Sequence, residues 1–527
     1  MKSQTAVARG ATSLYVANVI VLLANTLYFL VLTNVLRSTL DVGIVTALNI
    51  TIWLLVTLCI LAQPVTVQSP IPAPLAVLKF LPELMAKRTR TDAARVFRVS
   101  LGTAGVLGAA VAGTLAVFPN LIIPLIGGQA IQPDFVRLSA LDVLVISLGQ
   151  VCIGSLVALG EMKKASIYII CWSIVRYTFA SLLLIPYSIS GVLIGWIIGD
   201  AALLGVALWS AIRQVHGDSK TARFPLFDLA RYSLYTLFSA LIGFAINQAD
   251  KIFTLASQGL RELAIYNVAI VAASFAGFAP YALITVLLPA LSVLHSSNKT
   301  GEMRQMIRIY TRYVSIVVLP IAFGFASITE VALRIFGPTY TSGLLPSVIV
   351  SVATGLTAIG AVYAGALLAL GRLRWYTAAN LLGLATLFSV SALSTGIIGI
   401  SGPALGRAGL MVTAAVVYAI AVRRSGFLEL DWKAFLIAGI GSGVMGIVVF
   451  SILSALPTFF LKLVALPFLV SLGAGIYLAS LRVSRLLTQS DLDFMGDIMP
   501  KRFHSLHPII GKLVAVEQAN KGTARTG

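Results

Sequence analysis

Long apolar runs alternate with short polar segments along almost the whole chain, and fourteen of these runs have the length of a membrane span. An α-helix needs roughly 20 residues to cross the hydrocarbon core of a bilayer. The runs lack the period-two alternation of a membrane β-barrel, so each predicts a transmembrane helix and the fold class is all-α membrane. The predicted spans are 12–36, 42–66, 94–118, 134–159, 164–186, 190–213, 229–256, 262–292, 306–329, 341–369, 374–394, 400–422, 433–456 and 459–481.

The composition supports the same fold class. Hydrophobic residues make up 58% of the 527 residues and charged residues only 11%, whereas a soluble domain carries about 25% charged residues. A soluble chain this apolar would have too little polar surface to cover its core. The first apolar run is longer than the core of a signal peptide, so we expect it to be a retained span.

The charge is distributed in a way that predicts the topology. The formal net charge is +19, which in a soluble protein would suggest a nucleic-acid partner. Here the basic residues lie in short loops, where they act as topology signals. With a cytoplasmic N-terminus, thirty lysines and arginines fall on the cytoplasmic side and five, including Lys251, on the outer side. We therefore expect a prokaryotic cytoplasmic-membrane protein with both termini in the cytoplasm and no nucleic-acid partner.

Short motifs recur at a displacement of 211 residues, which indicates an internal repeat. Leu156–Gly160 matches Leu367–Gly371, and Ile189–Gly191 matches Ile400–Gly402. Six helices per copy make both copies enter the membrane from the same side, as in transporters whose parallel repeats enclose a central cavity. The predicted parts are an N-terminal lobe 1–215, a C-terminal lobe 226–425, an additional helix pair 433–481 and a cytoplasmic tail 482–527.

Five motifs carry a resemblance to a known family: Ala249–Lys251, Glu262–Tyr266, Leu287–Ser292, Arg334–Pro338 and Leu367–Gly371. With them the chain resembles the multidrug/oligosaccharidyl-lipid/polysaccharide exporter superfamily, and within it the Wzx-type polysaccharide flippases. The resemblance implies alternating-access export of a polyprenyl-(pyro)phosphate-linked oligosaccharide. The partners it implies are that lipid-linked glycan, membrane lipids and, as further candidates, glycan-assembly enzymes. No cofactor is expected.

Three charged residues lie at similar depth inside the predicted spans of the N-terminal lobe. A charge at this depth is costly and persists when it is paired or faces water. Arg176 in the fifth span has Asp142 in the fourth span and Asp200 in the sixth within reach. Arg176 either faces the central cavity and holds a phosphate oxygen, for which its planar fork is suited, or forms an internal ion pair that fixes packing.

The C-terminal lobe has its own candidates. Arg407 replaces the tryptophan found at the matching position of the first copy, so it is either a substrate ligand or an interface anchor. Asp250 and Lys251 near the outer end of the seventh span are either an ion-coupling site or an outer-surface ion pair. Asn25 and Gln63, in the first two spans, line the cavity or bond between helices.

Small residues mark two predicted packing faces. Gly191, Gly195 and Gly199 form a stripe in the sixth span, and Gly439 and Gly443 form a shorter one in the thirteenth. Such stripes let helix backbones approach closely in a membrane. We expect both to serve packing.

Two other functions are considered. An ion-coupled multidrug efflux antiporter of the same superfamily would have the same architecture, but usually twelve helices, and would need a cavity dominated by carboxylates. A membrane glycosyltransferase is suggested only by Asp491–Asp493, a short motif in the tail with no catalytic domain around it. We therefore expect no enzyme activity, no catalytic residues and no metal site.

Overall fold

The computed structural model describes residues 2–62, 76–86, 90–215, 226–277, 287–288 and 290–486. The main helices are α1 (Lys2–Leu36), α2 (Thr39–Ile60), α3 (Ala76–Ala86), α4 (Arg90–Val117), α6 (Pro133–Ala158), α7 (Met162–Gln214), α8 (Leu226–Gln258), α9 (Leu260–Ala273), α11 (Thr300–Phe336), α12 (Leu344–Ala369), α13 (Leu373–Ile398), α14 (Ser401–Arg424), α15 (Trp432–Ala455) and α16 (Phe459–Val483). Short helices lie between them: η1 (Pro119–Leu121), α5 (Ile123–Ile126), η2 (Gly128–Ala130) and η4 (Pro338–Gly343).

The predicted all-α membrane class is confirmed. Twelve helices of the described residues are long and apolar enough to cross a membrane. One of them, the 53-residue α7, holds both the fifth and the sixth predicted spans. The eighth predicted span, 262–292, is not one continuous helix: α9 ends at Ala273, residues 274–277 form turns, and described helical residues resume at 287. Each of the other spans has a single helix as its counterpart.

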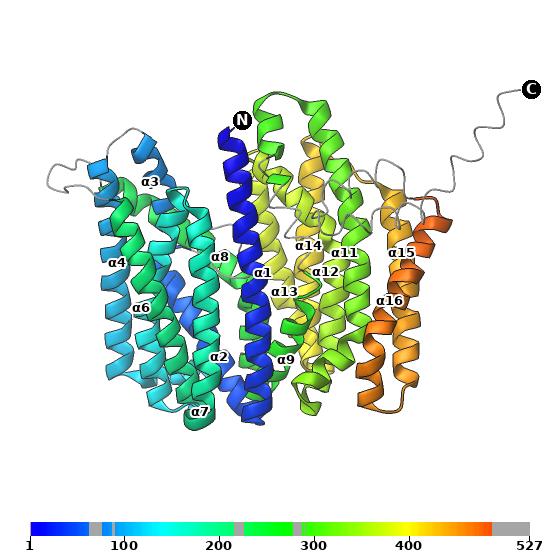
Figure 1. The fold of residues 1–527 in the computed structure, drawn as a ribbon, viewed down its shortest axis with the longest axis horizontal. Coiled ribbons are helices and arrows are strands. Elements are labelled where there is room, and N and C mark those ends of the chain that lie inside the picture. The colour runs from blue at the N-terminus through cyan, green and yellow to red at the C-terminus, as the bar shows by residue number, and fades with distance from the viewer. Residues whose placement is uncertain are drawn as a thin grey trace, which may run out of the picture.

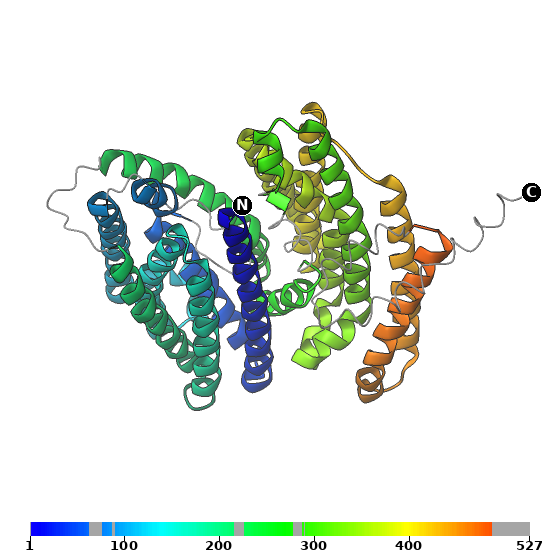
Figure 2. The same cartoon turned by 45° about the horizontal axis from the view of Figure 1, so that its top comes forward.

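The helices form two groups side by side with a pair at one edge (Figure 1). Helices α1 to α7 make one group and α9 to α14 the other. Helix α8 packs against α2 and α3 on one side and against α13 and α14 on the other, so it connects the two groups (Figure 2). Helices α15 and α16 pack on α11. The start of α1 and the end of α16 lie at the same end of the bundle.

Two helix hairpins in the two groups are built in the same way. The chain reverses inside α7 at Ser188, with φ 52° and ψ −132°, and between α13 and α14 at Gly399, with φ 56° and ψ −133°. The two residues are 211 positions apart, which is the displacement of the sequence repeat. A Cβ at Gly195 would meet Ala180 backbone at 2.3 Å, so only glycine permits this close approach between the two halves of α7.

The first glycine stripe serves packing, as expected, and the second does not. A Cβ at Gly199 would lie 2.5 Å from the Cα of Arg176, so this glycine brings the two halves of α7 together at that arginine. Gly439 and Gly443, in contrast, have open space where a Cβ would be. Helix α15 instead uses Gly441, where a Cβ would lie 2.3 Å from the Ser480 hydroxyl of α16.

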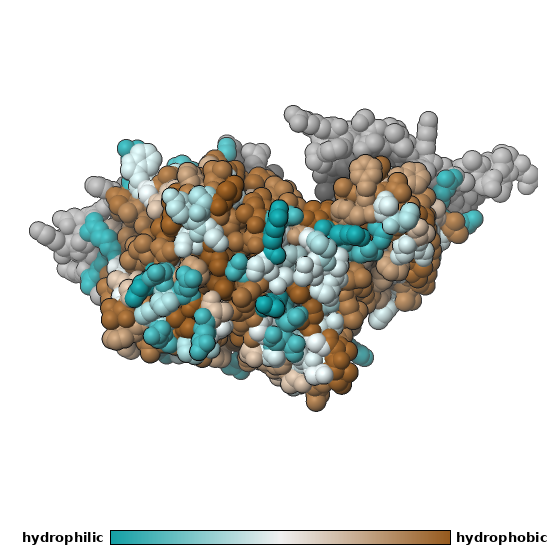
Figure 3. All heavy atoms as spheres, turned by 90° about the horizontal axis from the view of Figure 1, so that it is seen from below, coloured by the Kyte–Doolittle hydropathy of each residue, from teal (hydrophilic) through white to brown (hydrophobic). Residues whose placement is uncertain are grey.

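The two groups also meet at the lower end of the view in Figure 1. A Cβ at Gly43 of α2 would lie 2.1 Å from the carbonyl oxygen of Leu260 at the start of α9. The Asn34 side chain of α1 donates a 3.2 Å hydrogen bond to the carbonyl oxygen of Ile335 in α11. Seen from below, this end carries scattered hydrophilic side chains among hydrophobic ones (Figure 3).

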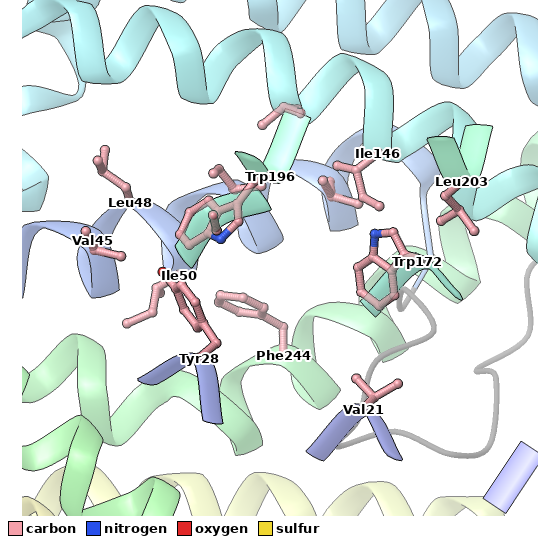
Figure 4. Packing of buried hydrophobic residues seen from close by; sticks show 14 of the residues in the cluster. Val21, Tyr28, Val45, Leu48, Ile50, Ile146, Trp172, Trp196, Leu203 and Phe244 are labelled. Carbon is pink, nitrogen blue, oxygen red and sulfur yellow. The ribbon is translucent and has the colours of Figure 1, made fainter. Parts of the chain in front are cut away.

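A cluster of large side chains links α1, α7 and α8 at the centre of the bundle. Figure 4 shows Tyr28 of α1 beside Phe244 of α8, with Trp196 and Trp172 of α7 around them. The rings of Tyr28 and Trp196 meet edge-on at 6.5 Å. Aromatic ring contacts stabilise a core in addition to the stability that burial of apolar surface gives. They hold α7 in place next to helices α1, α2, α8 and α9.

Candidate functional site: a central cavity and two charged clusters

A cavity of about 150 Å³ lies between the first helix group and helices α8 and α9. Ligand sites are typically about 300–1000 Å³, so in this conformation the cavity admits a small group such as a phosphate, and a larger head group needs the helices to move apart. Helices α1, α2, α8 and α9 each contribute one face, because their lining residues recur mostly at three to four positions, the spacing of one side of an α-helix. The lining residues are Leu22, Asn25, Phe29, Thr46, Asn49, Ile50, Trp53, Thr57, Trp172, Tyr177, Phe244, Asn247, Gln248, Lys251, Asn267, Ile270, Val271 and Ser274.

The lining combines amides, hydroxyls and aromatic rings with a single charge. Asn25, Asn49, Asn247, Gln248 and Asn267 supply amide groups that both donate and accept hydrogen bonds. Among the lining residues in the described part of the chain, none is a carboxylate. The segments 63–75 and 278–286, which follow α2 and precede residue 287, contain no charged residue in sequence.

Lys251 is the charged lining residue, and it is only 6% exposed. Among the described residues no carboxylate lies within ion-pair distance of it. A buried cation is costly unless something compensates its charge. Within the described part of the chain, Lys251 is therefore a buried cation at the wall of a cavity without an ion-pair partner. It does not lie in an outer loop, where the topology count had placed it, because α8 continues to Gln258.

The residue next to it is engaged elsewhere. Asp250 is 0% exposed and accepts two hydrogen bonds through the same oxygen, from the Arg407 guanidinium at 2.8 Å and from the Tyr266 hydroxyl at 2.8 Å. Its other oxygen has no hydrogen-bond partner within the described residues. Asp250 is thus the centre of a buried cluster from α8, α9 and α14.

A second cluster lies inside the first helix group. Arg176 is 2% exposed and forms ion pairs with Asp200, which is in direct contact with it, and with Asp142 at 3.6 Å. Its guanidinium also lies over the rings of Trp196, at 4.9 Å, and Trp172, at 5.7 Å. The cluster contains one cation and two carboxyl groups, both fully buried.

This cluster is separated from the cavity by one layer of side chains. Trp172 lines the cavity and its indole N–H donates a hydrogen bond to Asp200. Tyr177 also lines the cavity and stacks on Tyr28 at 5.1 Å between ring centroids. Arg176 itself is not a lining residue. Of the two alternatives for Arg176, the geometry favours the internal ion pair.

The remaining predicted site residues divide into three groups. Asn25 lines the cavity, as does Lys251. Arg407 does not line it: its guanidinium is bound to Asp250, and the side chain is 14% exposed. Gln63, Asp491 and Asp493 lie outside the described residues. The sequence analysis assigned no role to Asn49, Trp53, Trp172 or Asn267. The signal that could have found them is the presence of amide and aromatic side chains inside apolar runs.

The architecture matches that of known transporters. A structure described as the lipid II flippase MurJ in an inward closed conformation is 12% identical, with a TM-score of 0.69, covering 89% of this chain and 99% of that one. A MATE transporter of Vibrio cholerae in its bent form is 16% identical, with a TM-score of 0.56, covering 81% and 100%. A MOP superfamily transporter of Pyrococcus furiosus, described as having a binding pocket of reverse polarity, is 14% identical, with a TM-score of 0.58, covering 80% and 96%.

The fold and the helices define the class: this chain is a multi-pass membrane protein whose fold is similar to that of solved MOP superfamily transporters. Within that class, a family model described as polysaccharide biosynthesis protein matches residues 84–343. This match covers slightly less than half of the chain and agrees with the resemblance to polysaccharide flippases found in the sequence, and the solved structures named above are described as a flippase and as transporters. No curated protein matches the sequence.

Proposed function

We propose that this protein is a flippase that moves a polyprenyl-(pyro)phosphate-linked oligosaccharide across the prokaryotic cytoplasmic membrane by alternating access. One observation carries the proposal: Lys251 is a buried cation at the cavity wall with no carboxylate paired to it among the described residues. A phosphate group in the cavity would compensate that charge, and charge-assisted hydrogen bonds to phosphate are strong.

The rest of the lining suits the glycan part of such a substrate. Amide side chains match the hydroxyl groups of sugars, and the faces of Trp53 and Trp172 provide flat apolar surfaces for sugar rings. A polar head group loses its water on entering the membrane, and these groups replace the hydrogen bonds that it loses. The prenyl chain needs no such replacement and stays in lipid.

The efflux antiporter is the weaker proposal. A cavity for organic cations needs anionic side chains, and the lining residues in the described part of the chain include a lysine and no carboxylate. The carboxyl groups of Asp250 and Asp200 lie behind the wall and are bound to arginines.

The experiment uses the purified full chain in vesicles that contain a fluorescent prenyl-pyrophosphoryl disaccharide. A membrane-impermeant quencher is added outside the vesicles. Transport is measured as the loss of fluorescence of lipid that was protected in the inner leaflet and has moved to the outer leaflet. Lys251→Gln should reduce the transport rate at least about tenfold, the loss expected when one charge-assisted contact is removed, and Lys251→Arg should retain most of it.

A matched control removes a lysine that lies in an ion pair away from the cavity. Lys462 of α16 is bound to Glu330 of α11 at 2.8 Å and does not line the cavity. Lys462→Gln should therefore leave transport unchanged. Equal transport by Lys251→Gln and the unsubstituted protein would remove the anion site from the mechanism, and transport of organic cations instead of the lipid-linked glycan would support the antiporter.

A further inference from the structure

The balance of charge at the cavity wall depends on a residue that does not line the cavity. Lys251 and Asp250 are consecutive in α8, so a cation and an anion are attached to the same turn of helix. Their charges would cancel at the cavity if nothing else were present, since both are buried and little water screens them. An anionic ligand would then gain nothing from Lys251.

Arg407 changes this balance. Its guanidinium reaches across from α14 and binds Asp250 at 2.8 Å, on the oxygen that also accepts from Tyr266. The carboxylate is thus compensated by a cation from another helix. The charged side chains of this cluster within the described residues are two cations and one carboxylate, which leaves one positive charge over, and the cation that lines the cavity is Lys251.

We infer that Arg407 is a positioning residue that keeps Lys251 available to an anion by occupying Asp250. This inference rests on the proposed function. It states that the site recognises the phosphate of a lipid through one net positive charge. The prediction that Arg407 itself binds the substrate is replaced, because its side chain is held behind the wall. Its place in the repeat supports a special role: the matching residue of the first copy, Trp196, packs over Arg176 and carries no charge.

The test is a charge series in one protein. Arg407→Gln leaves one cation and one carboxylate, Asp250→Asn leaves two cations, and the double variant Asp250→Asn/Arg407→Gln leaves one cation, as in the unsubstituted cluster. The protein is placed in nanodiscs of phosphatidylcholine, and undecaprenyl phosphate is titrated as the probe. Tryptophan fluorescence, to which Trp53 and Trp172 of the cavity contribute, reports binding.

The expected order follows the net charge. Arg407→Gln should weaken binding at least about tenfold, Asp250→Asn should bind as tightly as the unsubstituted protein or more tightly, and the double variant should recover the loss. Arg407→Lys, which keeps the charge, should retain most of the affinity. A merely structural role of Arg407 predicts instead that binding follows the thermal unfolding midpoint, so that Asp250→Asn, which leaves the largely buried Arg407 without this carboxylate, binds less tightly than the unsubstituted protein.

Two results would overturn the inference. One is unchanged binding in Arg407→Gln while Lys251→Gln loses it, which keeps the proposed function and removes Arg407 from it. The other is a double variant that binds as poorly as Arg407→Gln although its thermal unfolding midpoint is unchanged. If Lys251→Gln and Arg407→Gln both bind as tightly as the unsubstituted protein, the anion site itself is refuted, and with it the proposed function.

Separate titrations identify the source of the phosphate. Inorganic phosphate and dioleoyl phosphatidic acid are used with the same variants. If inorganic phosphate and phosphatidic acid both bind more weakly than undecaprenyl phosphate, the result supports a site for the prenyl carrier. Equal binding of phosphatidic acid with the same dependence on charge supports the role of Arg407 and assigns the phosphate to a phospholipid head group. Binding of any of the three that ignores the charge series counts against the inference.

Discussion

Replacing Arg176 by methionine tests the internal ion pair most directly. Methionine keeps much of the length of the side chain and removes the one guanidinium that lies between the carboxyl groups of Asp142 and Asp200. Both carboxyl groups are fully buried, so water cannot take the place of the arginine. The two tryptophan rings that face the guanidinium also lose their cation.

The size of the effect follows from these contacts. Removing one partner of a buried ion pair costs about 3–5 kcal/mol, mostly because a charge is left without compensation. The lost contacts with the tryptophan rings add roughly 0.5–2 kcal/mol. Against a total stability of about 5–15 kcal/mol, Arg176→Met should lower the apparent unfolding midpoint in detergent strongly and reduce the yield of folded protein.

Variants in which the carboxyl groups are also made neutral test whether the effect comes from the ion pair. Asp142 has no hydrogen-bond donor on either oxygen among the described residues, so an amide at this position removes a charge and supplies a donor. Asp142→Asn should therefore be tolerated. The triple variant Asp142→Asn/Arg176→Met/Asp200→Asn removes every charge of the cluster and should regain most of the stability lost in Arg176→Met, since a neutral replacement of a buried ion pair is often neutral or stabilising.

The refuting result is a variant that is stable but inactive. If Arg176→Met unfolds at the same temperature as the unsubstituted protein and yet no longer transports the lipid-linked glycan, then Arg176 contacts the substrate during the transport cycle. The phosphate-binding alternative that the sequence left open would then be the correct one.

Three further predictions concern the backbone and the ion pair between Asp431 and Arg312. Ser188→Gly should raise the unfolding midpoint by the equivalent of about 1 kcal/mol, because φ 52° with ψ −132° is a glycine conformation; no change would mean that the turn is unstrained. Gly43→Ala should separate α2 from α9, where the Cβ would lie 2.1 Å from the Leu260 oxygen, and disulfide trapping between cysteines placed on the two helices should become slower; an unchanged trapping rate would refute this. Burial alone would raise the pKa of Asp431, but the hydrogen bonds from the Ala434 amide and the Arg312 guanidinium outweigh it and hold that pKa below its usual value. The contribution of this group to stability is thus present above the unfolded pKa of about 3.9 and is lost as the pH falls through the folded value, and Asp431→Asn should remove that part of the pH dependence in thermal unfolding.

Much of the fold was predictable because the bilayer imposes simple rules. Backbone groups in hydrocarbon must be bonded within their own segment, so long apolar runs become helices. The reversal near residue 188 was visible as a break between two runs, and the structure places it at Ser188. The break in the eighth span was not visible, since residues 262–292 read as one continuous apolar run. Hydrophobicity along the chain does not show where a helix ends when the end is buried inside the protein.

The candidate site was predictable in its residue types and not in its pairings. Charges inside apolar runs identified Arg176, Asp200, Asp250, Lys251 and Arg407 as unusual. Hydropathy gives the depth of each charge but not the direction in which its side chain points. Two side chains at equal depth can lie on opposite faces of their helices.

The sequence by itself determined that this protein lies in a lipid bilayer, that it is all-helical and which residues carry charge into the membrane, because these depend on composition and on the run length of one chain segment. Only the tertiary structure decided that Arg407 binds Asp250 across 157 positions of sequence and that Lys251 is left at the cavity wall. The physical reason is that a buried charge is compensated by its nearest neighbour in space, and helix packing chooses that neighbour.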